Sequence, residues 1–349
     1  MRIPCLIALS GLILTSSLPA ARAQEFRVED VAGVSDLDLA QVKPGVIAFN
    51  DDQKSTSAGG EVIKLISFQE WERTQPAQKK FLSPFPGYTE PTVTKVASAG
   101  ATSAPVTQKL TMYVAQARFI LNRPPGAIDL AHYVTLAFLE KIDPAIKHKE
   151  IAADDVNPLK DRQGKGNANP DRKWCTGRPA LVCIESSYKL EGKIPMGILL
   201  VNKLRDSPKK LSDHIDFESE LSQPAPADLD QGGLKDLTGL DAPIAGALEQ
   251  NIFYVNQIMK FGKFFAVFQN DPADAGRTVV TAYMALAVET SVLDKQKEFE
   301  NVPVLRNLVP AQVLMGQSSF NSGDSISAGL PKYARNEIRM VAALLARDN

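Results

Sequence analysis

The chain has few of the residues that carry most enzyme and metal chemistry. Its 349 residues include three histidines and three cysteines. No G-x-S-x-G motif marks a nucleophilic serine, and the segment 164–166 (Gly-Lys-Gly) lacks the spacing of a phosphate-binding loop. Paired acidic residues, as at 51–52 and 154–155, fall in polar stretches where solvated charge is the simpler interpretation. No local motif therefore identifies a catalytic residue or a cofactor site.

An excess of one charge is absent as well. The chain has 39 basic and 40 acidic residues and a formal net charge of −1, which gives no electrostatic reason to bind nucleic acid. No segment approaches the run of about 18 apolar residues that suggests a transmembrane helix. The hydrophobic share of 44% is enough for a packed core and too high for a disordered protein. We expect a soluble, folded mature chain without a transmembrane segment.

The first 23 residues resemble a signal for export. Arg2 gives a positive start, the apolar run 6–14 follows, and Ala21-Arg22-Ala23 is an A-x-A cleavage site before Gln24. The rival interpretation is a membrane anchor, but Ser10-Gly11 break the apolar run, and a spanning helix needs about 20 residues. The pattern predicts a cleaved signal peptide over residues 1–23 and a periplasmic or secreted protein.

Export gives meaning to the two cysteines that remain, Cys175 and Cys183. In an oxidising compartment this pair is expected to form a disulfide, which stabilises by about 2–3 kcal/mol for so short a loop. A redox or metal site is the alternative. Redox pairs favour C-x-x-C spacing, and no histidine lies near this pair in sequence. We therefore predict a structural disulfide.

Composition predicts three regions: the signal peptide 1–23, an irregular N-terminal region and linker over 24–106, and a globular α+β domain over 107–349. The boundary follows from residues 74–107, which are rich in Pro, Ser, Thr, Ala and Gly. Beyond it, 110–121 fits a helix or a strand.

The C-terminal part shows β patterns followed by a helix. Residues 214–221 alternate as a half-exposed strand, and aromatic residues concentrate in 252–268. Residues 278–288 suit a strand, with a helix over 282–299 as the alternative. An apolar stripe predicts an amphipathic helix over 331–346. We expect an antiparallel sheet packed on this helix, an element order that resembles the helix-grip folds.

Two sets of side chains are candidate binding sites. His214, Asp216 and Glu218 project from one strand face about 7 Å apart in succession and could hold a divalent cation, although a solvated strand face explains them equally. The other set would line an apolar cavity between the aromatic segment and the last helix, with a well-packed core as the alternative. Its members are Phe253, Phe265, Tyr283 and Met340.

Three functions are compatible with these features. The first is an exported, non-catalytic protein that binds a small apolar or lipid-like ligand. The second is an exported hydrolase whose catalytic residues form no local motif. The third is a structural or interaction protein of the cell envelope that uses its polar N-terminal region for docking. Export, the aromatic segment and the missing catalytic motifs favour the first.

Overall fold

A computed structural model describes ten ranges of the chain: 34–36, 47–48, 66–95, 104–155, 174–178, 180–189, 214–252, 259–290, 337–338 and 340–347. Residues 1–23, which are expected to form a signal peptide, lie outside these ranges, as do Phe253 and residues 291–299.

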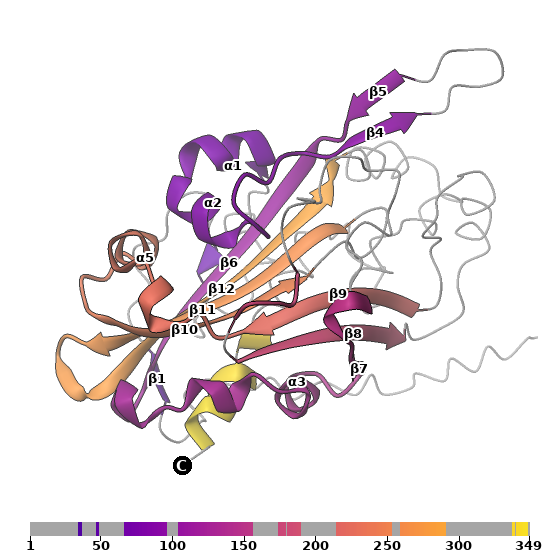
Figure 1. Cartoon of the computed structure of the whole chain (residues 1–349). Coiled ribbons are helices and arrows are strands. Elements are labelled where there is room, and N and C mark those ends of the chain that lie inside the picture. The colour runs from indigo at the N-terminus through magenta and orange to yellow at the C-terminus, as the bar shows by residue number, and fades with distance from the viewer. Residues whose placement is uncertain are drawn as a thin grey trace, which may run out of the picture.

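Most of the described strands form one large sheet (Figure 1). Its main path runs β1-β6-β12-β11-β10-β9-β8-β7, and every neighbouring pair on this path is antiparallel. The strands are β1 (Val34–Asp36), β6 (Leu110–Leu121), β7 (Ile146–Glu150), β8 (Leu181–Lys189), β9 (His214–Ser222), β10 (Ile244–Ile252), β11 (Met259–Asp271) and β12 (Asp274–Glu289). Two further short strands, β2 (Ile47–Ala48) and β3 (Ile66–Ser67), also pair with β6. This architecture, with helices beside an antiparallel sheet, agrees with the expected α+β class.

The central strands are apolar on both faces, because both faces of the sheet are covered. Residues 279–288 of β12 are all buried, and β6 is buried along most of its length. Of the two alternatives left open for 110–121, the structure shows the strand. The helix alternative is wrong for residues 282–289, where the chain pairs with β11 and β6. Good helix formers such as Ala, Met and Leu form a strand here because tertiary pairing overrides their weak local preference.

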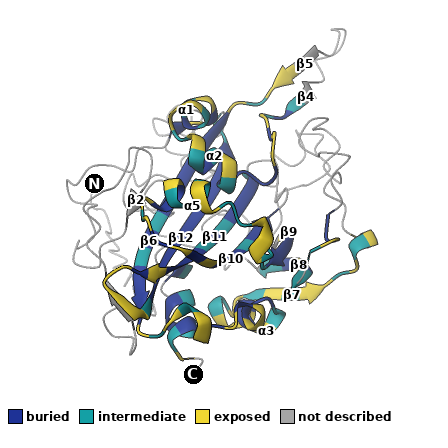
Figure 2. Ribbon diagram, turned by 60° about the vertical axis from the view of Figure 1, so that its left-hand side comes forward, coloured by how far each residue is buried: buried dark blue, intermediate teal, exposed yellow. Residues whose placement is uncertain are grey.

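Helices cover the sheet on two sides (Figure 2). One face, called here the α2 face, packs against α1 (Phe68–Thr74), α2 (Pro76–Leu82) and α5 (Gln231–Thr238). The opposite face, called the α3 face, packs against η3 (Leu130–Tyr133) and α3 (Leu136–Ile142). Each face has its own cluster of buried apolar side chains, so the strand residues alternate between two cores.

The expected irregular segment before residue 107 is wrong for residues 68–82, which form α1 and α2. Ser67 caps α1 by accepting a hydrogen bond from the Glu70 N–H at 3.1 Å, and Pro76 begins α2. Trp71 and Leu82 are fully buried in the α2-face cluster. The boundary near 107 stays a prediction.

A two-stranded ribbon, β4 (Thr92–Lys95) and β5 (Ala104–Thr107), projects from the end of the sheet (Figure 1). Val106 of β5 is 36% exposed, and among the described residues it is the exposed large hydrophobic side chain.

Three short helical elements follow β6. The chain forms η2 (Pro125–Ala127), η3 and α3, which Thr135 caps by accepting from the Phe138 N–H at 3.2 Å. Leu130 of η3 packs directly over Gly246 of β10, where a Cβ would lie 2.4 Å from the leucine Cδ1. A glycine in β10 is what allows this close approach.

The described residues near the C-terminus are helical. Three of their side chains, Ile338, Ala342 and Leu345, belong to the α3-face cluster, and the Leu345 carbonyl accepts a hydrogen bond from Arg123 Nη2 at 2.5 Å. No helix in the described ranges is both long enough and apolar enough to cross a membrane. Two short 3₁₀ turns complete the described helices, η4 (Ala153–Asp155) and η5 (Pro226–Asp228).

Candidate functional site: a buried ion cluster beside an aromatic layer

Four neighbouring strands place a polar row on the α2 face. The register pairs Cys183 with Glu220, Glu220 with Asn251, and Asn251 with Lys263. Directly paired residues of antiparallel strands point to the same face, so these side chains lie side by side. All four residues are less than 10% exposed.

A second row runs parallel to the first on the same face. Here Ser222 pairs with Glu249, Glu249 with Phe265, and Phe265 with Tyr283. The row therefore begins with polar side chains on β9 and β10 and continues as aromatic side chains on β11 and β12. The site has a charged half and an aromatic half that meet between Glu249 and Phe265.

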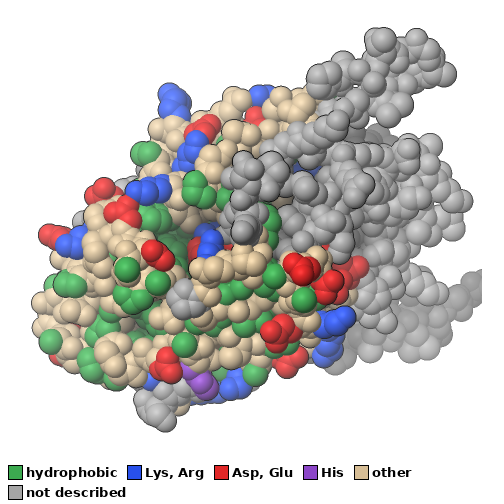
Figure 3. Space-filling view, viewed as in Figure 1, with side chains coloured by type: hydrophobic (Ala, Val, Ile, Leu, Met, Phe, Trp, Pro, Cys, Tyr) green, Lys and Arg blue, Asp and Glu red, His purple; other side chains and the backbone are tan. Residues whose placement is uncertain are grey.

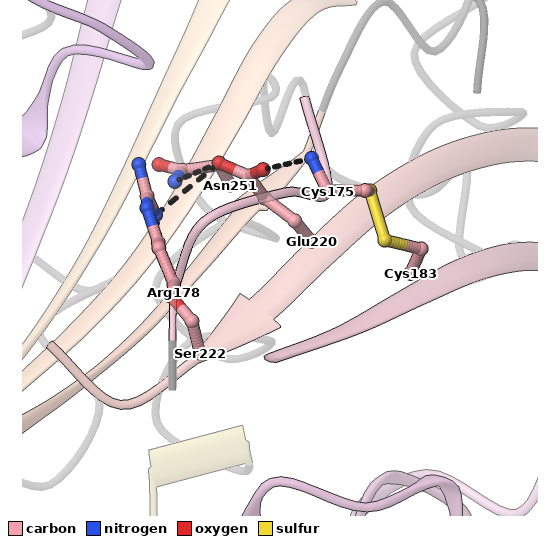
Figure 4. Close-up of a disulfide and its surroundings, with 6 residues drawn as sticks. All are labelled: Cys175, Arg178, Cys183, Glu220, Ser222 and Asn251. Atoms are coloured by element: carbon pink, nitrogen blue, oxygen red, sulfur yellow. Dashed lines mark hydrogen bonds and ion pairs between the residues drawn. A yellow bond between two sulfur atoms is a disulfide. The ribbon is translucent and has the colours of Figure 1, made fainter. Parts of the chain in front are cut away.

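The charged half is held together by ion pairs and hydrogen bonds, of which Figure 4 shows those around Glu220. Glu249 accepts from Arg178 Nη1 at 2.5 Å through Oε1 and from Lys263 Nζ at 2.7 Å through Oε2. Glu220 accepts from Asn251 Nδ2 at 3.1 Å and lies 3.4 Å from Arg178 Nη1. Two carboxylates and two cations thus form a cluster that is neutral as a whole.

The electrostatic environment keeps Glu249 ionised. Burial alone raises the pKa of this carboxyl, but Lys263 and Arg178 outweigh burial and lower the pKa from its ordinary 4.5 to about 2. A carboxyl with this pKa is a poor general acid or base near neutral pH. Glu249 therefore acts as a fixed negative charge.

The disulfide loop brings Arg178 to this cluster. Cys175 and Cys183 form a disulfide with their Cα atoms 5.8 Å apart, and the Cys175 N–H donates to Glu220 Oε2 at 3.1 Å. Two non-glycine residues of the loop have positive φ, 58° at Cys175 and 42° at Ala180. Such backbone conformations are strained and persist only where surrounding contacts hold them.

Among the residues that the structure describes, one polar atom of the cluster has no hydrogen-bond partner. Asn251 is 1% exposed and donates to Glu220, but its Oδ1 accepts no hydrogen bond. An unpaired buried acceptor costs free energy, so this atom is suited to a donor from outside the protein.

The aromatic half consists of rings in mutual contact. Phe265 stacks on Phe81 of α2 with centroids 6.2 Å apart, and Tyr88 meets Phe261 edge to face at 4.8 Å. Lys263 Nζ lies 5.6 Å from the Phe265 ring centroid, which links the two halves. In Figure 3, basic and acidic side chains are visible near the middle of the described surface, close to apolar ones.

The apolar-cavity candidates are only partly brought together. Phe265 and Tyr283 are direct cross-strand partners, 5% and 1% exposed. Met340 is half-buried in the C-terminal helix, whose core side chains join the opposite cluster on the α3 face. Phe253 lies outside the described residues. Phe265 and Tyr283 therefore face α2 and α5, and the Tyr283 hydroxyl donates to the Leu237 carbonyl at 2.8 Å.

The metal candidates lie along β9. Asp216 is exposed and Glu218 is half-buried; both interact with other groups, and the side chain of His214 lies outside the described part. Within the described ranges, no group of three or more His, Cys, Asp or Glu side chains is arranged to hold a metal. The same strand instead contributes Glu220 to the ion cluster.

Sequence reasoning missed the ion cluster. The alternation over 214–221 predicts a half-exposed strand with Glu220 on the same face as Asp216 and Glu218, whereas Glu220 is 1% exposed beneath the disulfide loop. The available signal was Lys263, a charged residue inside the aromatic segment 252–268. A lysine among aromatic residues of a central strand needs a buried anionic partner.

No known family model matches the chain, and no curated protein is similar to it.

The depressed pKa of Glu249 predicts acid sensitivity. A carboxyl whose folded pKa is below its unfolded value adds stability at higher pH, and this stability is lost as the pH falls from about 4.5 to about 2. The contribution is on the order of 3 kcal/mol. Denaturant titrations at several pH values should show a smaller acid loss for Glu249→Gln than for the wild type. Equal losses would show that Glu249 does not carry this linkage.

Removal of the disulfide should lower the free energy of unfolding by about 2–3 kcal/mol. The double variant Cys175→Ser/Cys183→Ser loses the restraint on its unfolded chain and the support of the strained loop. Chemical denaturation of the variant and of the reduced wild type should give similar losses. A loss in the variant alone would point to the substitutions and not to the bond.

Proposed function

We propose that the protein is exported to the periplasm or secreted, and that it acts there by binding a small apolar or lipid-like ligand on its α2 face. The observation that carries the proposal is the concentration of aromatic rings on this face, directly beside fixed charges. Ligand sites are mostly apolar with a few placed polar groups, and this face has that composition.

Six rings of the aromatic layer form one connected set of contacts. They lie on α1, on the segment after α2, next to the disulfide and on β11, and their centroids are within about 6 Å of one another in each pair, as is usual for aromatic pairs. The contacts are Phe68–Trp71, Phe68–Tyr88, Phe85–Tyr88, Phe85–Trp174 and Tyr88–Phe261. Phe81 joins the same cluster while remaining only partly buried. These contacts support a ligand position under α2, whereas the sequence suggested one between the sheet and the last helix.

Export is supported by the signal-like residues 1–23 together with the disulfide. A bond between Cys175 and Cys183 forms and persists in an oxidising compartment. A non-catalytic role is supported by Glu249, whose charge is fixed by two cations and is not free for proton transfer. A binding protein is therefore favoured over a hydrolase.

We also propose that the C-terminal helix closes the α3 face of the sheet in the manner of a helix-grip fold. The buried side chains Ile338, Ala342 and Leu345 support this arrangement.

An interaction protein of the envelope is the second candidate, and the projecting β4–β5 ribbon favours it. The ribbon extends away from both cores and exposes Val106 (Figure 1). Exposed apolar residues on a protruding element are suited to contact with another protein.

Binding of a fluorescent fatty acid tests the proposed function. We expect saturable binding to the wild type, weakened about ten-fold or more in Phe81→Ala, because this ring is the partly exposed member of the layer. The matched control is Phe138→Ala, which removes a ring from the α3 face and should leave the affinity of the folded protein unchanged. Absence of saturable binding, or equal weakening by both variants, would contradict the proposal.

A further inference from the structure

The guanidinium of Arg178 occupies a ring of oxygen atoms. Its Nη1 lies 2.5 Å from Glu249 Oε1, 3.3 Å from Ser222 Oγ and 3.4 Å from Glu220 Oε1. These three oxygens come from two strands, β9 and β10, whereas Arg178 comes from the disulfide loop. The sheet therefore provides the acceptors, and a separate segment supplies the cation.

The acceptors are more firmly placed than the cation. Ser222 and Glu220 are no more than 1% exposed, while the Arg178 side chain is 33% exposed. Asn251 Oδ1 adds a buried acceptor that has no hydrogen-bond partner within the described part of the chain, on a residue that donates to Glu220. When the disulfide loop moves and Arg178 leaves, these oxygen atoms stay on the sheet. They can then accept hydrogen bonds from another donor.

Charge selects the kind of ligand. Without Arg178 the cluster would hold Glu220, Glu249 and Lys263, a net charge of −1. A monovalent cation restores neutrality, whereas a divalent metal would leave an excess positive charge next to the buried Lys263. The Asn251 acceptor also suits an N–H donor. So do the three oxygens that lie 2.5 to 3.4 Å from Arg178 Nη1. The matching group is a guanidinium or primary ammonium.

We propose that Glu220, Ser222, Asn251 and Glu249 form a binding site for the guanidinium or primary ammonium group of a small molecule. Arg178 fills this site while the disulfide is intact, and reduction of the Cys175–Cys183 bond releases Arg178 and opens it. This site goes beyond the apolar ligand of the proposed function, and either can be disproved without the other.

Backbone strain provides the reason for release. Cys175 and Ala180, on either side of Arg178, have positive φ values of 58° and 42°, and the disulfide ties the first of them to β8. When the bond is broken, both residues can relax to ordinary conformations, which moves Arg178 away from the oxygens. The closed loop is thus maintained by the bond as well as by the ion pairs.

The redox step is a thiol–disulfide exchange with a dithiol. The dithiol supplies two electrons and two protons, the Cys175–Cys183 bond breaks, and two thiols form. The dithiol becomes a disulfide.

Binding of methylguanidinium, followed by calorimetry and by protein NMR shifts, tests the proposal. We expect no saturable binding to the oxidised wild type, saturable binding to the dithiothreitol-reduced wild type, and binding to Arg178→Ala in both redox states. Tetramethylammonium, which has the charge but no N–H group, should bind at least about ten-fold more weakly. Glu185→Gln removes an exposed carboxylate of β8 that is not part of the proposed site, so this control variant should behave as the wild type.

Three results would overturn the proposal. One is the absence of methylguanidinium binding to folded Arg178→Ala. Another is binding to this variant but not to the reduced wild type, which would exclude redox release. The last is tighter binding of Ca²⁺ than of methylguanidinium to the variant. Fatty-acid binding measured on the same samples reports separately on the proposed function.

Discussion

Replacing Lys263 with methionine is expected to lower the free energy of unfolding by about 3–5 kcal/mol, the usual cost of removing one partner of a buried ion pair. Lys263 donates to Glu249 at 2.7 Å, and both side chains are largely buried, 6% and 13% exposed. Methionine retains the apolar volume but leaves the negative charge of Glu249 with Arg178 alone. Equilibrium denaturation in urea measures the loss.

The double variant Lys263→Met/Glu249→Leu is the control. It removes both charges together, so it should recover more than half of the loss, because a buried pair is often replaced by apolar residues at little cost. If the single variant loses less than about 1 kcal/mol, Lys263 does not neutralise a buried charge, and the description of the cluster is wrong.

Replacing Trp71 with alanine should cost about 3–5 kcal/mol, as for other buried aromatic residues. Trp71 is fully buried, contacts Phe68 with ring centroids 5.6 Å apart, and donates from Nε1 to the buried Gln78 at 2.9 Å. The substitution creates a cavity and leaves the Gln78 acceptor unpaired. Thermal and urea unfolding both report the loss.

Arg73→Ala, on the exposed side of the same helix, is the matched control and should change stability by less than about 0.5 kcal/mol. Similar small effects of both substitutions would mean that α1 is loosely attached, as the sequence suggested for the region before residue 107. A large effect of Trp71→Ala alone shows that α1 belongs to the core.

The long apolar strands could be predicted only in part, because a helix stayed open for 110–121 and 282–299, and the short helices could not be predicted. Residues 110–121 and 278–288 have too few polar side chains for one exposed face, which favours central strands. Helices α1 and α2 have seven residues each, and α2 lies in a stretch with many Pro and Ser residues. Short helices depend on tertiary packing, here of Trp71 and Leu82, more than on local propensity.

The ion cluster could not be derived from spacing along the chain. Arg178, Glu220, Glu249 and Lys263 come from a loop and three different strands, and strand register brings them together. Nothing local to Glu220 distinguishes it from Asp216, yet the disulfide loop covers the first and leaves the second exposed. The cysteine pair was predictable because the expected export would leave an even number of cysteines in an oxidising compartment, which points to a disulfide.

Native mass spectrometry of the full chain, expressed with residues 1–23 and purified from the compartment where it accumulates, tests the central claim most directly. The account predicts a chain that begins at Gln24, is two hydrogens lighter than the reduced form, and carries a bound apolar molecule. Gentle collisional activation should release this molecule, and Phe81→Ala should retain less of it. A chain that keeps residues 1–23, has two free thiols and carries no ligand in any preparation would contradict the account.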